Sequence, residues 1–223
     1  MSHRPFKDRV YRQFARIGHA LASEKRLEII DLLAQAPRHV DALAAETEQS
    51  VANVSQHLQV LRAAHLVDSH REGTRVIYRL ADPSVISMWL SLRNVAEQEL
   101  AEVSQITRDF LGDRAGNVST RDELAEKLAL DEVFLIDVRP SLEYASGHIP
   151  GAVRIPIEEL ASRLDEIPRD RPVIAYCRGE YCLFADEAVA LLREHGIAAA
   201  RLEGGWPEWL DEGRDISTNG NGK

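Results

Sequence analysis

Long apolar segments are missing from this 223-residue chain. No run approaches the roughly 20 residues that a membrane-spanning helix needs. The opening residues, "MSHRPFKDRVYRQF", also lack the apolar core and the small-residue cleavage site of a signal peptide. We therefore expect a cytoplasmic protein with no membrane partner.

Cysteine is nearly absent, and the only two, Cys177 and Cys182, share the stretch "YCRGEYC". Zinc prefers four ligands, and no cluster of histidine or cysteine supplies the remaining two. We therefore predict no metal site and no cofactor. Free cysteines are often inert packing residues. Inert cysteines have no reason to cluster in one short loop, however, so a chemical role is the better interpretation.

Positive net charge is also lacking, since the formal charge is −9. Residues 1–112 carry 14 Lys+Arg and 14 Asp+Glu, whereas residues 113–223 carry 13 and 22. All the excess acid therefore belongs to the second half. The first 26 residues hold seven basic side chains against two acidic ones, which permits positive patches and DNA binding in the first half.

The first half has the periodicity of helices followed by a hairpin. Apolar residues recur at three- and four-residue steps in the segments 6–21, 23–36 and 50–67. A short helical piece precedes the last of these, and two short helices joined by a tight turn form a helix-turn-helix. Residues 66–80 then alternate, with Glu72-Gly73 as the turn, which predicts a β-hairpin wing. Beyond Pro83, helical spacing continues for about seven turns to Phe110, a length that indicates a partner surface.

Past a polar stretch, the second half alternates strand and helix, beginning with a Thr120/Glu123 capping box. Continuous apolar strands separated by helices imply a parallel sheet covered on both faces. The predicted fold class is two domains, a mainly α winged helix with a hairpin wing and an α/β domain with a central parallel sheet. The predicted boundaries are 1–112 for the first domain, 113–118 for a linker, 119–216 for the second domain and 217–223 for a flexible tail.

Both cysteines lie at the carboxyl end of a central strand, because "PVIAYC" ends at Cys177 and a helix follows. Ligands of open α/β sheets bind there. Backbone N–H groups of the turn and of the helix N-terminus favour an anion, and a thiol at that spot is stabilised as the reactive thiolate. Arg178 adds a positive charge close by.

The second half resembles a single-domain rhodanese, a sulfurtransferase fold. The matching pieces are the cysteine loop, "LIDVRPSLEYASGHIPGAVRIP" at 135–156 and "LEGGWPEWLDEGRDI" at 202–216. The resemblance implies that catalytic Cys177 takes sulfur as a persulfide and hands it to an acceptor such as cyanide or a thiol. It also implies that the substrate loop consists of Arg178, Gly179, Glu180 and Tyr181.

The loop departs from the usual rhodanese pattern, which has glycine at its fourth position. Here Gly179 is third, Glu180 is fourth and the sixth residue is Cys182. An acidic Glu180 beside an anion cradle weakens the case for thiosulfate. Cys182, as a resolving thiol, can attack a persulfide on Cys177, close a disulfide and release sulfide. Leu183 stands where phosphate- and arsenate-binding relatives of the fold have arginine, which excludes their chemistry.

Five other residues of this half have structural roles in our interpretation. We expect His148 to hold a turn by hydrogen bonding and Asp137 and Arg139 to form a structural pair. Trp206 and Trp209 are predicted to cover the core.

The first half resembles the winged helix of the ArsR family of repressors over residues 6 to about 110. The matching stretches are "ALASEKRLEIIDLLA", "SVANVSQHLQVLRAAHLV" and "SHREGTRVIYRL". The resemblance implies a homodimer, built through its first and last helices, that places two recognition helices in successive major grooves of double-stranded operator DNA. The family's usual metal-sensing cysteines and histidines are missing, and we interpret His39 and Asp41 as solvated or capping residues.

On the recognition helix, Val54, Leu58 and Leu61 are predicted to face the core, which turns a polar face outward. Asn53 and Gln56 are the base-reading candidates, because Asn and Gln can pair bidentately with adenine. The predicted DNA-binding residues are Ser50, Ala52, Asn53, Ser55, Gln56 and Gln59, with Arg71, Thr74 and Arg75 at the wing tip meeting phosphates.

Together the two halves predict a dimeric DNA-binding repressor that senses reactive sulfur or thiol redox state through the two cysteines. Two alternatives stay open: a sulfurtransferase enzyme that moves sulfane sulfur through a Cys177 persulfide, and a sensor of arsenite or another soft metalloid. The expected partners are operator DNA, a second copy of the chain and a small sulfur donor or thiol acceptor.

Overall fold

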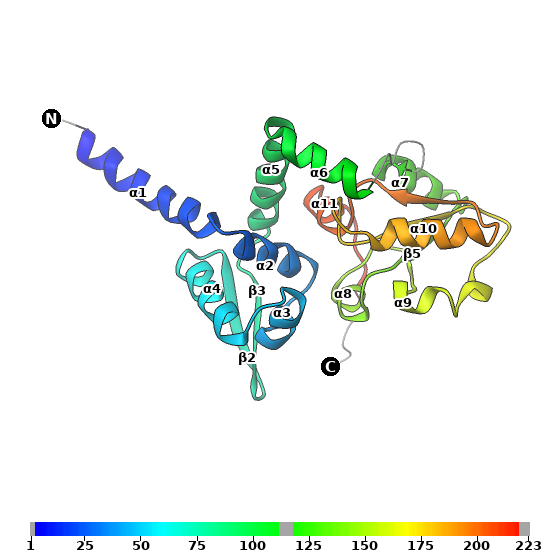
Figure 1. Cartoon of the computed structure of the whole chain (residues 1–223), viewed down its shortest axis with the longest axis horizontal. Coiled ribbons are helices and arrows are strands. Elements are labelled where there is room, and N and C mark those ends of the chain that lie inside the picture. The colour runs from blue at the N-terminus through cyan, green and yellow to red at the C-terminus, as the bar shows by residue number, and fades with distance from the viewer. Residues whose placement is uncertain (1–2, 112–117, 219–223) are drawn as a thin grey trace. The chain divides into compact units, whose positions relative to one another are not determined.

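The computed structural model describes residues 3–111 and 118–218 and divides into two compact units, Met1–Ser91 and Leu92–Lys223 (Figure 1). We call them the N-terminal and the C-terminal unit. The predicted linker falls almost wholly on residues 113–117, which lie outside the described residues, as do residues 219–223 of the predicted tail. None of the helices in the described ranges is long and apolar enough to cross a membrane.

The N-terminal unit is a winged helix, as predicted. Its elements in chain order are α1 (Arg4–Leu21), α2 (Glu24–Gln35), β1 (Arg38–His39), α3 (Val40–Glu46), α4 (Val51–Ala63), β2 (Val67–Glu72), β3 (Arg75–Leu80) and the first part of α5 (Ser84–Glu99). The core-facing residues of α4 are Val54, Leu58 and Leu61, all buried at the predicted helical spacing. The polar side of α4 is thereby fixed toward solvent.

The wing is an antiparallel hairpin whose register runs from Val67↔Leu80 to Glu72↔Arg75. This register leaves Gly73 and Thr74 as the two turn residues, rather than the predicted Glu72 and Gly73, because Glu72 pairs with Arg75 as the last residue of β2. Gly73 adopts the left-handed φ of +59° that such a turn favours. The short strand β1 adds a third strand by pairing with β3. Sequence analysis missed β1, because two residues are too few to show alternation.

The helix predicted to run unbroken from Ser84 to Leu111 is two helices. α5 ends at Glu99, and α6 spans Ala101–Leu111. Apolar residues keep helical spacing across the break, so the periodicity could not reveal it. The division between the compact units also falls inside α5, at Leu92, rather than at the end of this region.

The C-terminal unit contains a five-stranded parallel sheet in the order β4-β8-β7-β5-β6. Beyond α5 and α6 its elements are β4 (Val118–Ser119), α7 (Arg121–Ala129), β5 (Phe134–Asp137), α8 (Ser141–Ser146), β6 (Val153–Arg154), α9 (Ile157–Leu160), a 3-10 turn (Leu164–Glu166), β7 (Val173–Tyr176), α10 (Phe184–Glu194), β8 (Ala199–Leu202) and α11 (Trp206–Asp211). The capping box of α7 is present, with Thr120 and Glu123 each bonding the other's backbone N–H. The central parallel sheet is therefore confirmed.

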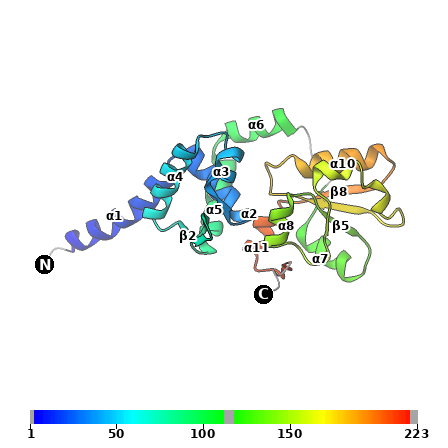
Figure 2. The ribbon, with the colours of Figure 1, turned by 90° about the horizontal axis from the view of Figure 1, so that it is seen from below.

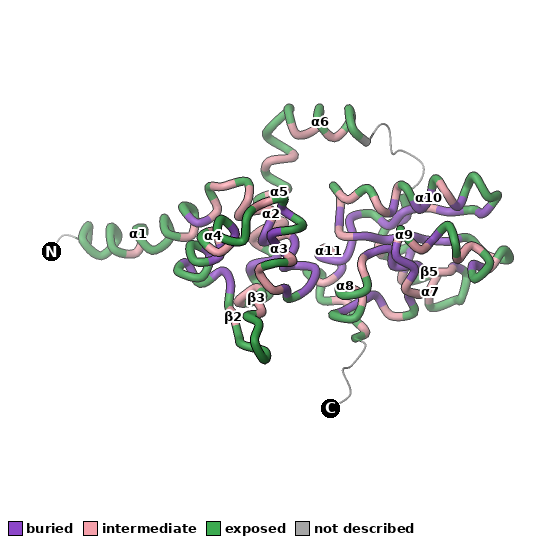
Figure 3. The backbone as a smooth tube through the Cα atoms, turned by 60° about the horizontal axis from the view of Figure 1, so that its bottom comes forward, coloured by how far each residue is buried: buried purple, intermediate pink, exposed green. Residues whose placement is uncertain are grey.

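Helices cover both faces of the sheet, because successive strand residues point to opposite sides. Ile136 and Val173 pack with α9 and α10 on one face, whereas Leu135 and Ile174 pack with α7 and α11 on the other. Figure 2 shows α10 and α7 on opposite sides of β5. All four residues of β7 and the last three of β5 are buried, as their continuous apolar runs predict, and the tube around β5 is mostly purple in Figure 3.

The residues given structural roles fulfil them. Trp206 and Trp209 are buried in the core. His148 stacks on Tyr144 and bonds its backbone oxygen through Nδ1. His148 also exchanges two backbone hydrogen bonds with Ser217, so the first residue of the predicted tail is held.

Asp137 and Arg139 form a fully buried ion pair at the end of β5, with 2.6 Å between Arg139 Nη2 and Asp137 Oδ2. Tyr176 donates its hydroxyl to the same carboxylate at 2.6 Å. Burial alone would lower the pKa of Arg139, but the charge and hydrogen bonds of Asp137 raise it. The guanidinium also donates to the carbonyl of Gly147, so one ion pair joins two strands and the turn after α8.

Replacing Asp137 with alanine leaves a buried guanidinium without its carboxylate. We expect Asp137→Ala to lower the free energy of unfolding of the C-terminal unit by about 3–5 kcal/mol. Urea denaturation followed by tryptophan fluorescence measures the change. The matched control is Glu166→Ala, which removes an exposed partner of Arg163 and should cost about 0–1 kcal/mol. Equal losses in both variants would contradict the structural role of the buried pair.

Candidate functional site

The two cysteines flank a tight loop between β7 and α10. Cys177 follows the last residue of β7 and is 2% exposed, while Cys182 is half-buried near the start of α10. The Cys182 N–H donates to the Gly179 carbonyl at 3.1 Å and closes the turn. Gly179 has a φ of +143°, which a side chain would strain.

Backbone from the turn before α11 packs directly on this loop. A Cβ at Gly205 would lie 2.5 Å from both the Cys177 oxygen and the Gly179 nitrogen. Trp206 donates its N–H to the Cys177 carbonyl at 3.1 Å. Glycine at 205 is therefore required by the close approach of two backbones, and the turn before α11 supports the cysteine loop.

The pKa values of the two neighbouring thiols are shifted in opposite directions. Burial raises the pKa of the Cys177 thiol well above its usual value, and its hydrogen bond to Cys182 raises it further. The Cys177 thiol faces two carbonyl oxygens as a donor. Its Sγ lies 3.6 Å from the oxygen of Cys182 and 3.8 Å from the oxygen of Gly179. The Cys177 hydrogen bond lowers the pKa of Cys182, and the N–H groups of Arg178 and Phe184 lower it too.

This arrangement differs from the expectation that the loop stabilises a thiolate at Cys177. N–H groups act on both sulfurs, those of Gly179 and Ala185 lowering the pKa of Cys177 and those of Arg178 and Phe184 lowering that of Cys182, but burial in the core outweighs them at Cys177. Burial disfavours the charged thiolate, so the Cys177 thiol keeps its proton. The loop therefore favours the thiolate at its sixth position rather than at its first.

Arg178 is turned toward a buried carboxylate that sequence analysis missed. Its guanidinium binds Glu143 through Nε at 2.9 Å and Nη2 at 2.6 Å, and Glu143 is fully buried in α8. The guanidinium also lies 5.6 Å from the ring centre of Phe184. The positive charge that the sequence places in the loop is thus largely compensated by a residue 35 positions away.

Glu180 is likewise neutralised. Its carboxylate accepts from Nη2 of Arg201, a buried residue of β8, at 2.9 Å. Pairing with Arg201 offsets the charge with which Glu180 was expected to repel an anionic donor such as thiosulfate. Nothing in the local sequence around Arg201 marks it as a partner of the loop.

Tyr181 projects from the loop and meets α5 within the C-terminal unit. Its hydroxyl donates to Glu97 at 2.7 Å, and burial raises its pKa. The guanidinium of Arg93 lies 5.7 Å from the ring centre of Tyr181 and pairs with Glu208 of α11. The loop is therefore linked to α5 by one hydrogen bond and by an arginine between them.

The predicted DNA-contacting residues fall into two groups. Ala52, Asn53, Gln56 and Gln59 lie exposed on α4, and the wing-tip residues Arg71, Thr74 and Arg75 are also exposed. The hydroxyls of the two predicted serines instead bond the backbone of α4. Ser50 accepts from the Asn53 N–H as the N-cap, and Ser55 donates to the Val51 carbonyl. The outward polar face of α4 is thus carried by its amide side chains.

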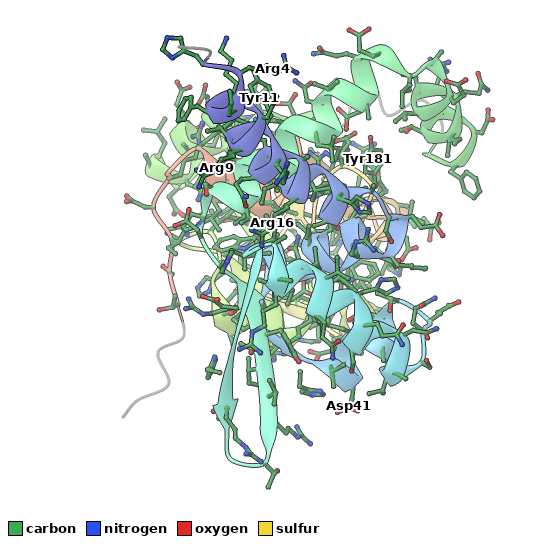
Figure 4. The ribbon with its side chains drawn as sticks, turned by 90° about the vertical axis from the view of Figure 1, so that its left-hand side faces the viewer. Arg4, Arg9, Tyr11, Arg16, Asp41 and Tyr181 are labelled. Atoms are coloured by element: carbon green, nitrogen blue, oxygen red, sulfur yellow. The ribbon has the colours of Figure 1, made fainter. Side chains whose placement is uncertain are left out.

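His39 and Asp41, the N-terminal residues considered as metal ligands, are a capping residue and an exposed residue of α3. His39 caps α3 by accepting from the Ala42 N–H at 3.2 Å. Asp41 is exposed on α3 (Figure 4). Within residues 3–111 and 118–218, no group of three or more histidine, cysteine or acidic side chains could hold a metal ion.

A helix-turn-helix with a hairpin wing, followed on the same chain by a parallel sheet with a cysteine loop, defines a two-domain DNA-binding regulator with a sulfurtransferase-like domain. Two family models match these parts: bacterial regulatory protein, arsR family, over residues 23–69, and rhodanese-like domain over residues 120–212. The chain belongs to the ArsR family of bacterial transcriptional regulators and carries a C-terminal rhodanese domain, as its motifs predict.

Known proteins resemble the whole chain or one half of it. The HTH-type transcriptional regulator Rv0324 of Mycobacterium tuberculosis is 44% identical over 210 residues, covering 92% of each chain. A sulfurtransferase of Allochromatium vinosum is 35% identical over 97 residues, which are 43% of this chain and 89% of that protein. Among solved structures, the homodimeric winged helix-turn-helix domain of Mb0332 from Mycobacterium bovis is 41% identical, covers 45% of this chain and 91% of its own, and has a TM-score of 0.42.

A methyl group added at position 205 should push against the backbone of Cys177 and Gly179 in the cysteine loop. We expect Gly205→Ala to destabilise the C-terminal unit by about 1–3 kcal/mol through overpacking and to change the alkylation rate of Cys182. Denaturation and iodoacetamide labelling measure the two effects. Gly18→Ala is the control, because a Cβ there meets nothing within 4 Å. A Gly205→Ala protein with wild-type stability and labelling would show that the loop backbone yields freely.

Proposed function

We propose that this regulator is a dimeric repressor, working in the cytoplasm, that releases operator DNA when reactive sulfur oxidises its two loop cysteines. The observation that carries the proposal is that Cys177 and Cys182, the only two cysteines of the chain, lie in one loop of a DNA-binding regulator with a rhodanese domain, where the Cys177 thiol donates to the Cys182 carbonyl at 3.6 Å. Two thiols in contact can accept a sulfane sulfur and close a disulfide between themselves. The reaction then leaves a disulfide in the loop, which is a lasting change in its structure.

Dimerisation is supported by the outer face of α1. Phe6, Tyr11 and Phe14 are 64–69% exposed along this helix, which is green for most of its length in Figure 3. In Figure 4, Arg4, Arg9 and Tyr11 project away from the α1 ribbon. Exposed aromatic residues on one helix mark a protein interface. A second copy packing there would set two α4 helices for successive major grooves about 34 Å apart.

α5 supplies a path from the loop to the DNA-binding unit. Its first turns belong to the N-terminal core, where Val85 is buried and Trp89 Nε1 donates to Asp31 at 2.9 Å. Its last turns carry Arg93 and Glu97, which meet Tyr181 within the C-terminal unit. A disulfide between the cysteines on either side of the loop would alter the position of Tyr181 and thereby its contact with α5. This differential contact is what an allosteric mechanism requires.

A working sulfurtransferase is the second candidate, supported by the rhodanese-like match over residues 120–212. The pairing of Glu180 with Arg201 also removes one objection to an anionic donor. In that case the loop transfers sulfur repeatedly, and the winged helix controls expression independently of it.

Sodium tetrasulfide, a sulfane-sulfur donor, should weaken operator binding by about 5- to 150-fold, the usual range of allosteric coupling. Cys177→Ser and Cys182→Ser should each abolish this change, because neither variant can form the disulfide. Fluorescence anisotropy with a duplex selected by the protein from random DNA measures the affinity, and dithiothreitol should restore it.

Each contrary result selects another function. An undiminished response in both serine variants removes the sensor proposal. Cys177-dependent turnover of thiosulfate and cyanide, with no effect of tetrasulfide on DNA binding, favours the enzyme. Release of DNA by arsenite but not by tetrasulfide favours a sensor of soft metalloids.

Tyr181→Phe tests the path through α5, because it removes only the hydroxyl that donates to Glu97. We expect the variant to bind operator DNA and to form the disulfide as the wild type does, but to lose most of the affinity change. The same anisotropy assay, with mass spectrometry of the disulfide, separates these effects. Glu99→Gln, an exposed change on the same helix, should respond normally. A normal response in Tyr181→Phe would place the coupling elsewhere.

A further inference from the structure

We propose that the C-terminal unit holds a second ligand site, separate from the two cysteines, which binds a short zwitterionic peptide, a molecule with one ammonium and one carboxylate group. The site is a cavity of about 800 Å³ whose walls come from α6, the last turns of α5, the sheet edge at β4 and β8, and the start of α11. Cavities of roughly 300–1,000 Å³ are typical of small-molecule sites. The inference does not depend on the sulfur chemistry of the proposed function.

The cavity adjoins the cysteine loop. Glu180 and Tyr181, which stand between the two cysteines, both line it. Glu208, another lining residue, places its two carboxylate oxygens 3.6 Å from the position that a Cβ at Gly179 would occupy. The Tyr181 hydroxyl donates to Glu97 of α5, which also lines the cavity. A ligand that fills the cavity therefore contacts the loop and α5 together.

α6 borders the cavity without closing it. Val103, Ser104 and Thr107 line the cavity from this helix and are only half-buried, and none of residues 101–110 is fully buried. A helix in a folded unit normally buries one stripe of its surface against a neighbour. The space beside α6 is therefore left for another molecule.

The charges around the cavity indicate the class of ligand. Four arginines and four glutamates line it, so neither sign is in excess. An inorganic anion such as thiosulfate would meet as many carboxylates as guanidinium groups. A zwitterion matches both signs, because its carboxylate can bind arginine through two parallel hydrogen bonds and its ammonium can bind a carboxylate.

Two of the lining charges are accessible to such a ligand. Arg108 of α6 and Glu203 of the turn after β8 are both exposed, and neither forms an ion pair within the described ranges 3–111 and 118–218. Arg108 donates to the neutral side chain of Gln105 at 3.3 Å. Two different walls of the cavity thus offer a cation for the ligand carboxylate and an anion for its ammonium.

Two enclosed atoms at the cavity also lack hydrogen bonds. Nε of Arg201 and Oε2 of Glu208 have no hydrogen-bond partner among the residues that the structure describes, although their side chains are only 7% and 12% exposed. The Arg201 Nε lies 3.9 Å from Asp186 Oδ1, which is beyond hydrogen-bond distance. Buried polar atoms are normally paired. A ligand that carries both a donor and an acceptor supplies both missing partners.

Isothermal titration calorimetry of the reduced, full-length protein with L-alanyl-L-alanine tests the site. We expect saturable binding of the free dipeptide. N-acetylation removes its ammonium and C-terminal amidation removes its carboxylate, so each blocked peptide should bind about tenfold more weakly or worse, the loss for one hydrogen-bonded charge. No binding of the free dipeptide, or equal binding of a blocked one, would overturn the inference.

Two tyrosine variants on α6 locate the bound peptide. Ser104→Tyr puts a ring into the cavity, whereas Gln105→Tyr puts the same ring on an exposed position that does not line it. We expect Ser104→Tyr to lose most of its affinity for the dipeptide and Gln105→Tyr to bind as the wild type does. Unchanged binding by Ser104→Tyr places the peptide elsewhere and removes the proposed site.

Glu203→Gln tests the charge requirement without changing the size of the side chain. This variant should no longer distinguish the free dipeptide from its N-acetylated form, and a retained preference contradicts the assignment of Glu203. These titrations contain neither DNA nor a sulfur donor. Their failure leaves the proposed function intact, and failure of the tetrasulfide response leaves this site intact.

Discussion

The cysteine loop depends on arginines that are held by carboxylates from other parts of the C-terminal unit. Arg139 is fixed by Asp137 beneath the sheet end, and Arg178 is fixed by buried Glu143. Arg201 of β8 holds Glu180 within the loop itself. Because these charges are paired, no net ionic field dominates the site. Ionisation of the thiols is then decided by burial, which is greater at Cys177, and by short-range hydrogen bonds.

Features that local sequence determines could be predicted. The capping box at Thr120 and the buried face of α4 each involve residues within one or two helical turns. The continuous apolar strands also predicted the parallel sheet. The place of the cysteines at a strand end followed from the same pattern.

Features that depend on distant residues could not be predicted. Glu143 is 35 positions from Arg178, and Arg201 is 21 positions from Glu180, so the sequence showed loop charges without their partners. Burial of Cys177, which raises the pKa of its thiol, likewise depends on packing with distant elements. The break between α5 and α6 escaped because the apolar spacing continues across it.

Burial of Cys177 bears on how long a response would last. Once a disulfide has formed, a cellular reductant has to attack the more accessible sulfur, that of Cys182. Cys177 is then the leaving group. A thiol that is held protonated in the core is a slow leaving group in such exchange. Under the proposed function, recovery would therefore lag behind the disappearance of the signal, and one enclosed side chain would set how long the regulator retains a record of recent sulfur exposure.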